Sequence, residues 1–261
     1  MSIVQDRIRD NMILAYERLG ALSGKSTFVQ TDRVQRFESD IPFGLFNGVF
    51  TYTYSGEADP AEEIKSLADL YRERGRKLAW VTYSHEPDDV IDKALAANDF
   101  KQVDSISGMA LSLENWSSEE AGIPGLEVRA IREPREIAQY RKVILAGFGI
   151  PEQMADLFSQ VFVDGPNADT AVIQHYLAYL DGNPVTTITT FTQGDVTGIY
   201  NIATLEAYRG RGLARATLDH VVRDVQAKGA EWAVIHATAM GASVYPKVGF
   251  KEEMTFNIYA G

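Results

Sequence analysis

The 261-residue chain contains no cysteine, which excludes disulfide scaffolds, cysteine metal sites and cysteine nucleophiles. It also lacks any run of about 20 apolar residues, so no membrane span is expected. The segment Met1 to Arg9 is polar and charged, unlike a signal peptide. Together these absences predict a cytoplasmic protein.

Basic residues are scarce: 25 Lys and Arg stand against 36 Asp and Glu, a net charge of −11. The densest basic run, at 72–77, lies at the end of a predicted helix and is typical of a solvated helix end. A chain this acidic repels phosphate backbones, so nucleic acid is not an expected partner. A cationic or amine-bearing partner is compatible with the charge.

The apolar content, 45%, is sufficient for two cores in a chain of this length. The stretch 114–125 is rich in Ser, Glu, Gly and Pro, a composition typical of linkers. We therefore predict two domains, residues 1–120 and 121–261.

Apolar periodicity and turn residues predict the elements. In the first half, helices are expected at 3–22, 60–75 and 87–97, and strands at 43–54, 78–83 and 105–113. In the second half, helices are expected at 133–147, 151–163, 213–228 and 239–248, and strands at 126–131, 171–180, 184–192, 197–205, 231–237 and 251–259. This order predicts an α+β fold, an α/β sandwich around a mixed sheet.

The two halves look like copies of one unit. Asn47 lies 28 residues before the helix-ending Gly75, and Asn201 lies 28 residues before Gly229. A tryptophan-containing strand, a short helix, a phenylalanine and a final strand follow in each half. The sequence therefore predicts an internal duplication.

One turn carries the clearest chemical signal. A strand ending near Thr204 runs into Arg-Gly-Arg-Gly-Leu-Ala at 209–214, where an amphipathic helix begins. Backbone N–H groups at a helix N-terminus bind anions, and glycines let the backbone approach a pyrophosphate closely. Leu213-Ala214 in place of Lys-Ser or Lys-Thr excludes the Walker pattern, and the dinucleotide fingerprint is absent.

Two motifs together resemble the GNAT superfamily of N-acetyltransferases. The pattern R/Q-x-x-G-x-G/A is met by Arg209, Gly212 and Ala214, and Tyr-x-x-x-Gly-Phe by Tyr245, Gly249 and Phe250. The resemblance covers roughly residues 124–261, and the first half looks like a degenerate copy. It implies two GNAT-like mixed-sheet domains in tandem.

The resemblance also implies a site for acetyl-coenzyme A. The pyrophosphate would lie on the N–H groups of Arg209, Gly210, Arg211, Gly212, Leu213 and Ala214. The pantetheine arm would pair with the strand edge at Ile202, Ala203 and Thr204, and Thr238 would contact the arm. Tyr245 would protonate the leaving thiolate.

The general base is not evident from the resemblance, because Gly198 stands where some members carry glutamate. Glu206, next to the phosphate turn, and His236, which shares a strand face with Thr238, are two candidates. Loss of the proton to solvent is a third route. Without a cysteine, direct attack of the amine on the thioester is favoured.

In the first half, Glu57 and Asp59 stand where phosphates would need positive charge, so no cofactor is expected there. The expected partner is a small-molecule or peptide amine. Phe148, Met154 and Phe158 are candidates for the acceptor cleft or for the core. A non-catalytic acyl-CoA sensor and a duplicated scaffold are the alternative functions, and a monomer or homodimer is expected.

Overall fold

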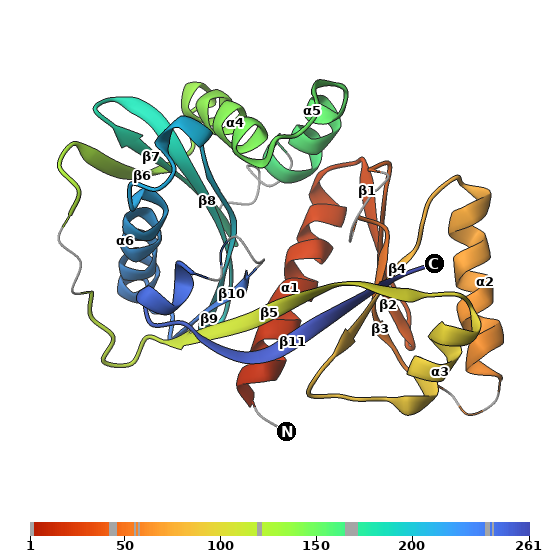
Figure 1. Cartoon of the computed structure of the whole chain (residues 1–261). Coiled ribbons are helices and arrows are strands. Elements are labelled where there is room, and N and C mark those ends of the chain that lie inside the picture. Colours follow the sequence, from red (N-terminus) through yellow and green to blue (C-terminus); the bar gives the residue numbers. More distant parts are fainter. Residues whose placement is uncertain are drawn as a thin grey trace.

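The computed structural model describes residues 3–261, apart from 42–45, 55, 57, 119–121, 165–171, 238–240 and 242 (Figure 1). The helices are α1 (Ile3–Leu22), α2 (Pro60–Glu73), α3 (Asp89–Ala97), α4 (Pro134–Phe148), α5 (Glu152–Ser159) and α6 (Leu213–Ala227). The strands are β1 (Ser26–Gln30), β2 (Val34–Ser39), β3 (Gly48–Tyr52), β4 (Ala79–Tyr83), β5 (Lys101–Ser112), β6 (Leu126–Ile131), β7 (Ile173–Leu180), β8 (Asn183–Gln193), β9 (Val196–Thr204), β10 (Trp232–Ala237) and β11 (Lys251–Ala260).

All the strands belong to a single mixed sheet in the order β1-β2-β3-β4-β11-β5-β10-β9-β8-β7-β6. The last strand of each half is exchanged. β11 pairs with β4 of the first half, and β5 pairs with β10 of the second. β5 and β11 also pair with each other, and Figure 1 shows them crossing side by side between the halves. The predicted boundary at 114–125 falls between β5 and β6, but neither half closes its sheet alone.

The chain order of elements repeats, as the duplication predicted. The series β1-β2-β3-α2-β4-α3-β5 corresponds to β7-β8-β9-α6-β10-turn-β11. The match of Asn47 with Asn201 was wrong, however. Asn47 O accepts from Ala79 N at the start of β4, whereas Asp195 O accepts from Trp232 N at the start of β10. Asn47 is therefore the structural counterpart of Asp195.

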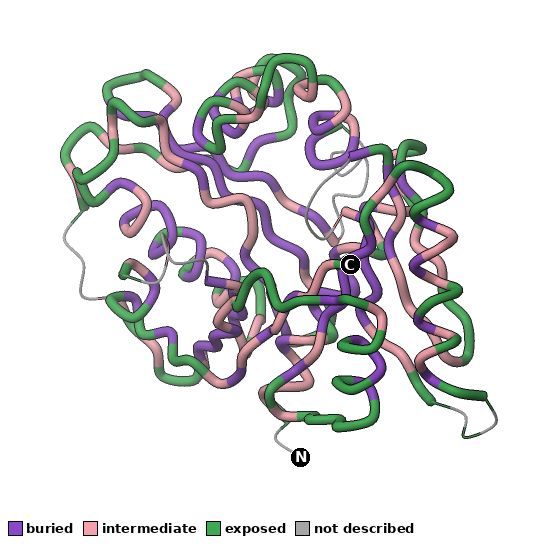
Figure 2. Tube along the Cα trace, turned by 45° about the vertical axis from the view of Figure 1, so that its right-hand side comes forward, coloured by how far each residue is buried: buried purple, intermediate pink, exposed green. Residues whose placement is uncertain are grey.

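Helix α1 covers one face of the sheet in both halves. Its buried residues share a core cluster with Phe50 of β3 and Phe256 of β11, and also with Phe191 of β8 and Tyr140 of α4. Helix α6 packs on the opposite face, where Leu218 and Val222 belong to a second cluster. Figure 2 shows the buried residues concentrated on the strands and on the inner sides of the helices.

Three predicted elements differ from the structure. Over the described part of 239–248, only a 3-10 turn at Tyr245–Lys247 forms, because Pro246 lacks the N–H of a regular helix. Over the described part of 43–54, the strand is limited to β3; the Asn47 side chain just before it accepts from Ser39 N and donates to Ile41 O. The helix expected at 151–163 is an α-helix only as far as Ser159, and one π-helical turn, Gln160–Asp164, follows it (the π-turn). β1 and β2 had no predicted counterpart.

A buried amide fixes α1 on the second half. Asn11 is 2% exposed; its Nδ2 donates to Phe191 O at 3.1 Å, and its Oδ1 accepts from the Tyr200 hydroxyl at 2.9 Å. A Cβ at Gly198 would lie 1.7 Å from Asn11 Oδ1. Gly198, which the resemblance places where some GNAT proteins carry glutamate, thus leaves room for an amide from α1.

Replacing Asn11 with alanine should lower the free energy of unfolding by about 1–3 kcal/mol, because a buried carbonyl and hydroxyl lose their partner. Denaturant unfolding measures this directly. Glu17→Ala on the exposed side of the same helix is the matched control and should have little effect. Equal stability of the two variants would show that the amide does not hold α1 in place.

Candidate functional site

The central feature of the site is the separation of β9 from β10. Over the residues that the structure describes, the pairing of these two parallel strands runs from Val196 to Ile199 and no further along β9. At Asn201 the backbone turns left-handed, with φ of 55°, and the pairing with β8 shifts register between Thr187 and Thr189. The bulge directs β9 away from β10. The backbone of Ile202, Ala203 and Thr204 therefore extends beyond the part of β9 that pairs with β10.

A buried polar network supports this bulge. Thr189 Oγ1 is 2.5 Å from the Tyr140 hydroxyl, 2.8 Å from His175 Nδ1 and 3.3 Å from Asn201 Nδ2. On the other side, Thr187 donates to Asn201 O at 2.9 Å. Burial lowers the pKa of His175 to about 4, so its ring is neutral at pH 7. The strained residue is thus held by uncharged partners from three elements.

The predicted phosphate turn lies directly after β9. Gly210 and Gly212 have φ of 75° and 77°, and Gly212 is the N-cap of α6. No side chain caps this helix, whose first-turn N–H groups have no acceptor within the helix. Buried Leu213 anchors the turn, and a Cβ on Gly210 would meet no atom within 4 Å. The turn is therefore open, and its N–H groups could hold an anion, an arrangement called the anion cradle below.

The two arginines of the turn have different surroundings. Arg209 Nε donates to Thr204 O at 3.1 Å, and its NH2 group donates to Gly147 O at 2.7 Å. Arg209 therefore fastens the turn to the end of β9 and to α4. The Arg211 guanidinium lies 5.6 Å from the Tyr208 ring centre and is exposed.

Helix α4 approaches β9 closely at a glycine. A Cβ on Gly147 would lie 2.9 Å from Ala203 Cβ and 3.4 Å from Thr204 N. A larger residue would press on the strand edge that the sequence assigned to the pantetheine arm. Gly147 and the contacts of Arg209 with it are positioning features that the sequence did not reveal, since no local pattern marks them.

The three predicted catalytic residues lie in different places. Half-buried His236 packs against the rings of Tyr200 and Phe256, and its covered Nε2 has no hydrogen-bond partner among the described residues. Tyr245 is buried in the α6 cluster, where burial raises its pKa to about 12. Glu206 is exposed beside the phosphate turn. Thr238 lies outside the described residues.

An apolar pocket of about 400 Å³ lies between the halves and reaches this region. It is bounded by α1, the end of α4, α5 with its π-turn, and β5, β8, β9, β10 and β11. Tyr200, Asn201 and His236 are among its lining residues, so the pocket meets β9 one residue before Ile202. Of the three cleft candidates, Phe148 and Phe158 line it, whereas Met154 packs against the core.

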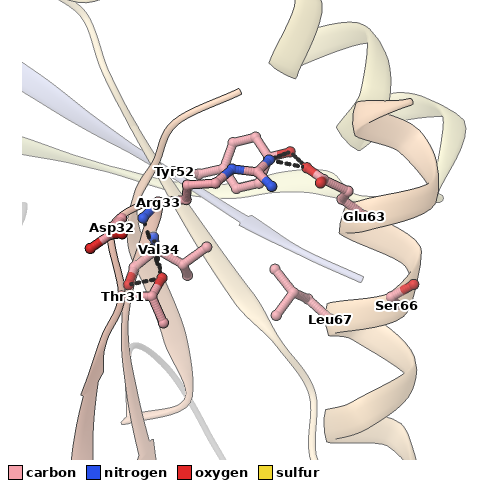
Figure 3. A pocket seen from close by; sticks show the side chains of 8 residues that line it. All are labelled: Thr31, Asp32, Arg33, Val34, Tyr52, Glu63, Ser66 and Leu67. Carbon is pink, nitrogen blue, oxygen red and sulfur yellow. Dashed lines mark hydrogen bonds and ion pairs between the residues drawn. The ribbon is translucent and has the colours of Figure 1, made fainter. Parts of the chain in front are cut away.

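The equivalent helix start in the first half, that of α2, differs from the start of α6 because a side chain caps it. The Asp59 carboxylate caps α2 by accepting from Ala61 N at 2.9 Å, so a negative side chain already occupies this N-terminus. The cavity beside α2, about 460 Å³, contains a cluster in which Arg33 and Tyr52 bond Glu63 (Figure 3). Both hydrogen bonds lower the pKa of Glu63, and the bond from Arg33 has the larger effect.

Comparisons with known proteins bear on the family and the fold. Residues 172–252 match the family model of the acetyltransferase (GNAT) domain. No curated protein sequence matches the chain. A GCN5-related N-acetyltransferase from Kribbella flavida shares 16% identity over 100% of this chain and 96% of that one, with a TM-score of 0.73.

Two further solved structures have similar folds. A GCN5-related N-acetyltransferase from Sphaerobacter thermophilus is 14% identical, covers 90% of this chain and 75% of its own, and has a TM-score of 0.67. A tandem GNAT protein from the clavulanic acid biosynthesis pathway is 12% identical over 97% and 95%, with a TM-score of 0.63. The resemblance to the GNAT superfamily is confirmed: residues 172–252 match its acetyltransferase domain, and the fold of the chain is similar to that of GNAT proteins.

Among the described residues, no helix is both long enough and apolar enough to cross a membrane.

The neutral histidines should make stability depend on pH. Burial lowers the pKa of His236 to about 4 from an ordinary value near 6.5. The unfolded chain therefore binds more protons between these values, and the free energy of unfolding falls as pH drops below 6.5. Relative to His236→Gln, the wild type should lose about 2 kcal/mol more between pH 7 and pH 5. Denaturant titrations at both pH values measure this, and equal losses would contradict the shift.

Proposed function

We propose that the protein is an acetyl-CoA-dependent N-acetyltransferase that passes an acetyl group directly to an amine. The observation that carries the proposal is the uncapped N-terminus of α6, with two left-handed glycines, placed directly after the strand that leaves β10. The start of α6 suits a pyrophosphate, which binds to backbone N–H groups. The end of β9 beyond its pairing with β10 suits the amide-bearing arm that follows the pyrophosphate, since such an arm can pair with a strand edge.

The described residues fit coenzyme A in three respects. Of the N–H groups at 209–214 that the sequence assigned to the pyrophosphate, that of Arg209 already donates to Glu206 O at 3.1 Å, so those of residues 210–214 would hold it. Exposed Arg211 would add a charge-assisted donor. The edge at 202–204 would pair with the pantetheine arm. Arg209 would keep these two parts in register through its bonds to Thr204 O and Gly147 O. The cofactor supplies the acetyl group as a thioester.

The transfer needs a polarised carbonyl, a proton acceptor and a proton donor. The amine nitrogen bonds to the carbonyl carbon while the carbon–sulfur bond breaks; the nitrogen loses one proton and the thiolate gains one. Thr204 N–H would polarise the carbonyl. His236, neutral at pH 7, would take the proton at Nε2, with exposed Glu206 as the alternative through water. The raised pKa of Tyr245 keeps its hydroxyl protonated at pH 7, so Tyr245 would donate a proton to the leaving thiolate.

Calorimetric titration with acetyl-CoA tests the cradle. The wild type should bind one cofactor per chain at micromolar affinity. Gly212→Glu should abolish binding, because it places a carboxylate and a strained Cβ where the pyrophosphate would lie. Gly229→Glu is the matched control, since Gly229 is also exposed and left-handed, with φ of 98°, but lies after the other end of α6. Equal loss in both variants, or no binding to the wild type, would refute the proposal.

Thiol release in an amine screen tests turnover. Tyr245→Phe should lower kcat by about 10- to 1,000-fold while leaving cofactor affinity nearly unchanged, because it removes only a proton donor. Circular dichroism of the variant checks that the buried ring still packs. Cofactor binding without thiol release for any amine would instead identify a non-catalytic acyl-CoA sensor.

A further inference from the structure

Among the described residues that line it, the pocket between the halves has no side chain with a formal charge at pH 7. Aliphatic and aromatic residues make up most of its lining, and the polar groups are the hydroxyls of Tyr16 and Tyr200, the Asn201 amide and the His236 ring. The Tyr200 hydroxyl is already engaged with Asn11. Burial holds His236 in its neutral form. Nothing in this lining offers a carboxylate to an ammonium group.

The geometry points to an acceptor amine that is uncharged at neutral pH and carries an apolar aromatic body, an arylamine, with its ring in this pocket and its nitrogen beside Asn201. This inference rests on the proposed acetyltransferase function and specifies its substrate class. The pocket volume, about 400 Å³, lies in the range of small-molecule sites. Asn201 in its lining directly precedes the strand edge assigned to the thioester arm, so the nitrogen would face the side from which the acetyl group arrives.

Charge is the first reason for this class. An alkylamine has a pKa close to that of lysine, about 10.4, so at pH 7 only about one molecule in 10³ is neutral. An ammonium without a counter-charge is strongly disfavoured in an apolar pocket. An arylamine is neutral at pH 7 and avoids both costs. Its nitrogen also has its lone pair free for attack and loses its proton only as the carbon–nitrogen bond forms.

The aromatic wall is the second reason. The Phe158 and Phe162 rings lie 4.6 Å apart at 32°, and the Phe46 ring meets Phe162 edge-on at 5.1 Å. Phe148, 6.5 Å from Phe158, lies at the mouth with 46% of its surface exposed. Aromatic rings favour such offset and edge-on contacts with one another, so this wall suits a flat ring.

The test compares two amines of similar shape and different charge. Thiol release from saturating acetyl-CoA is measured with 4-methylaniline and with 4-methylbenzylamine, using spermidine and a lysine peptide as charged references. At pH 7 the arylamine should have a kcat/KM at least about 100-fold higher than the benzylamine. The ratio should shrink by about tenfold per unit as pH rises toward 9, since the neutral fraction of the benzylamine grows in that proportion.

A rim variant gives a second readout. Phe148→Glu places a carboxylate at the exposed mouth and should raise kcat/KM for 4-methylbenzylamine at least about fivefold relative to 4-methylaniline. Val103→Glu is the matched control, because Val103 is also exposed, at 62%, and lies on β5 outside the pocket lining. It should leave the ratio unchanged. Equal effects of both variants would overturn the inference.

The outcomes separate the inference from the proposed function. Acetyl-CoA binding with preferred turnover of spermidine or the lysine peptide would overturn the arylamine class alone. The same holds if the protein binds acetyl-CoA but neither binds nor acetylates 4-methylaniline, or if octanoyl-CoA binds more tightly than acetyl-CoA and excludes the arylamine. Absence of acetyl-CoA binding would refute both.

Discussion

The antiparallel pairing of β5 with β11 is the contact on which the rest of the molecule depends. Because each half gives its last strand to the other, the two units share one sheet. They cannot separate without breaking the pairing of β5 with β10 and of β11 with β4. Helix α1 can then lie across one face of both halves. The pocket exists because of this arrangement, since its lining comes from α1, from the exchanged strands and from the second-half strands together.

Within that frame, the duplicated units have diverged at corresponding points. In the second half, the helix after the central strand begins at a glycine without a side-chain cap, and the strand leaves its neighbour at a bulge. In the first half, the corresponding helix is capped by the Asp59 carboxylate. A helix N-terminus that is filled by its own carboxylate does not attract a phosphate, so of these two helix starts only that of α6 is open to an anion.

Much of the second half was predictable from sequence because its signals are local. The turn at 209–214, the stripe of α6 and the hairpins around β8 are each specified by contiguous residues. The differences had local causes too: Pro246 stops a regular helix, and the Asn47 side chain, just before β3, is bonded to Ser39 N and Ile41 O. The repeat was recognisable, but its register was misread by matching Asn47 to Asn201, since only strand pairing shows which residues correspond.

The sequence by itself determined the GNAT resemblance, the cofactor motifs and the absence of cysteine chemistry, because these depend on residue type and short spacing. The tertiary structure alone decided the strand exchange and the bond of Asn11 to a strand 180 positions away. It also decided that Arg209 bonds the turn to α4 and that the described lining of the pocket is uncharged. These features join residues far apart in the chain. Their pairing is settled by packing and by the burial of polar groups, which no local pattern encodes.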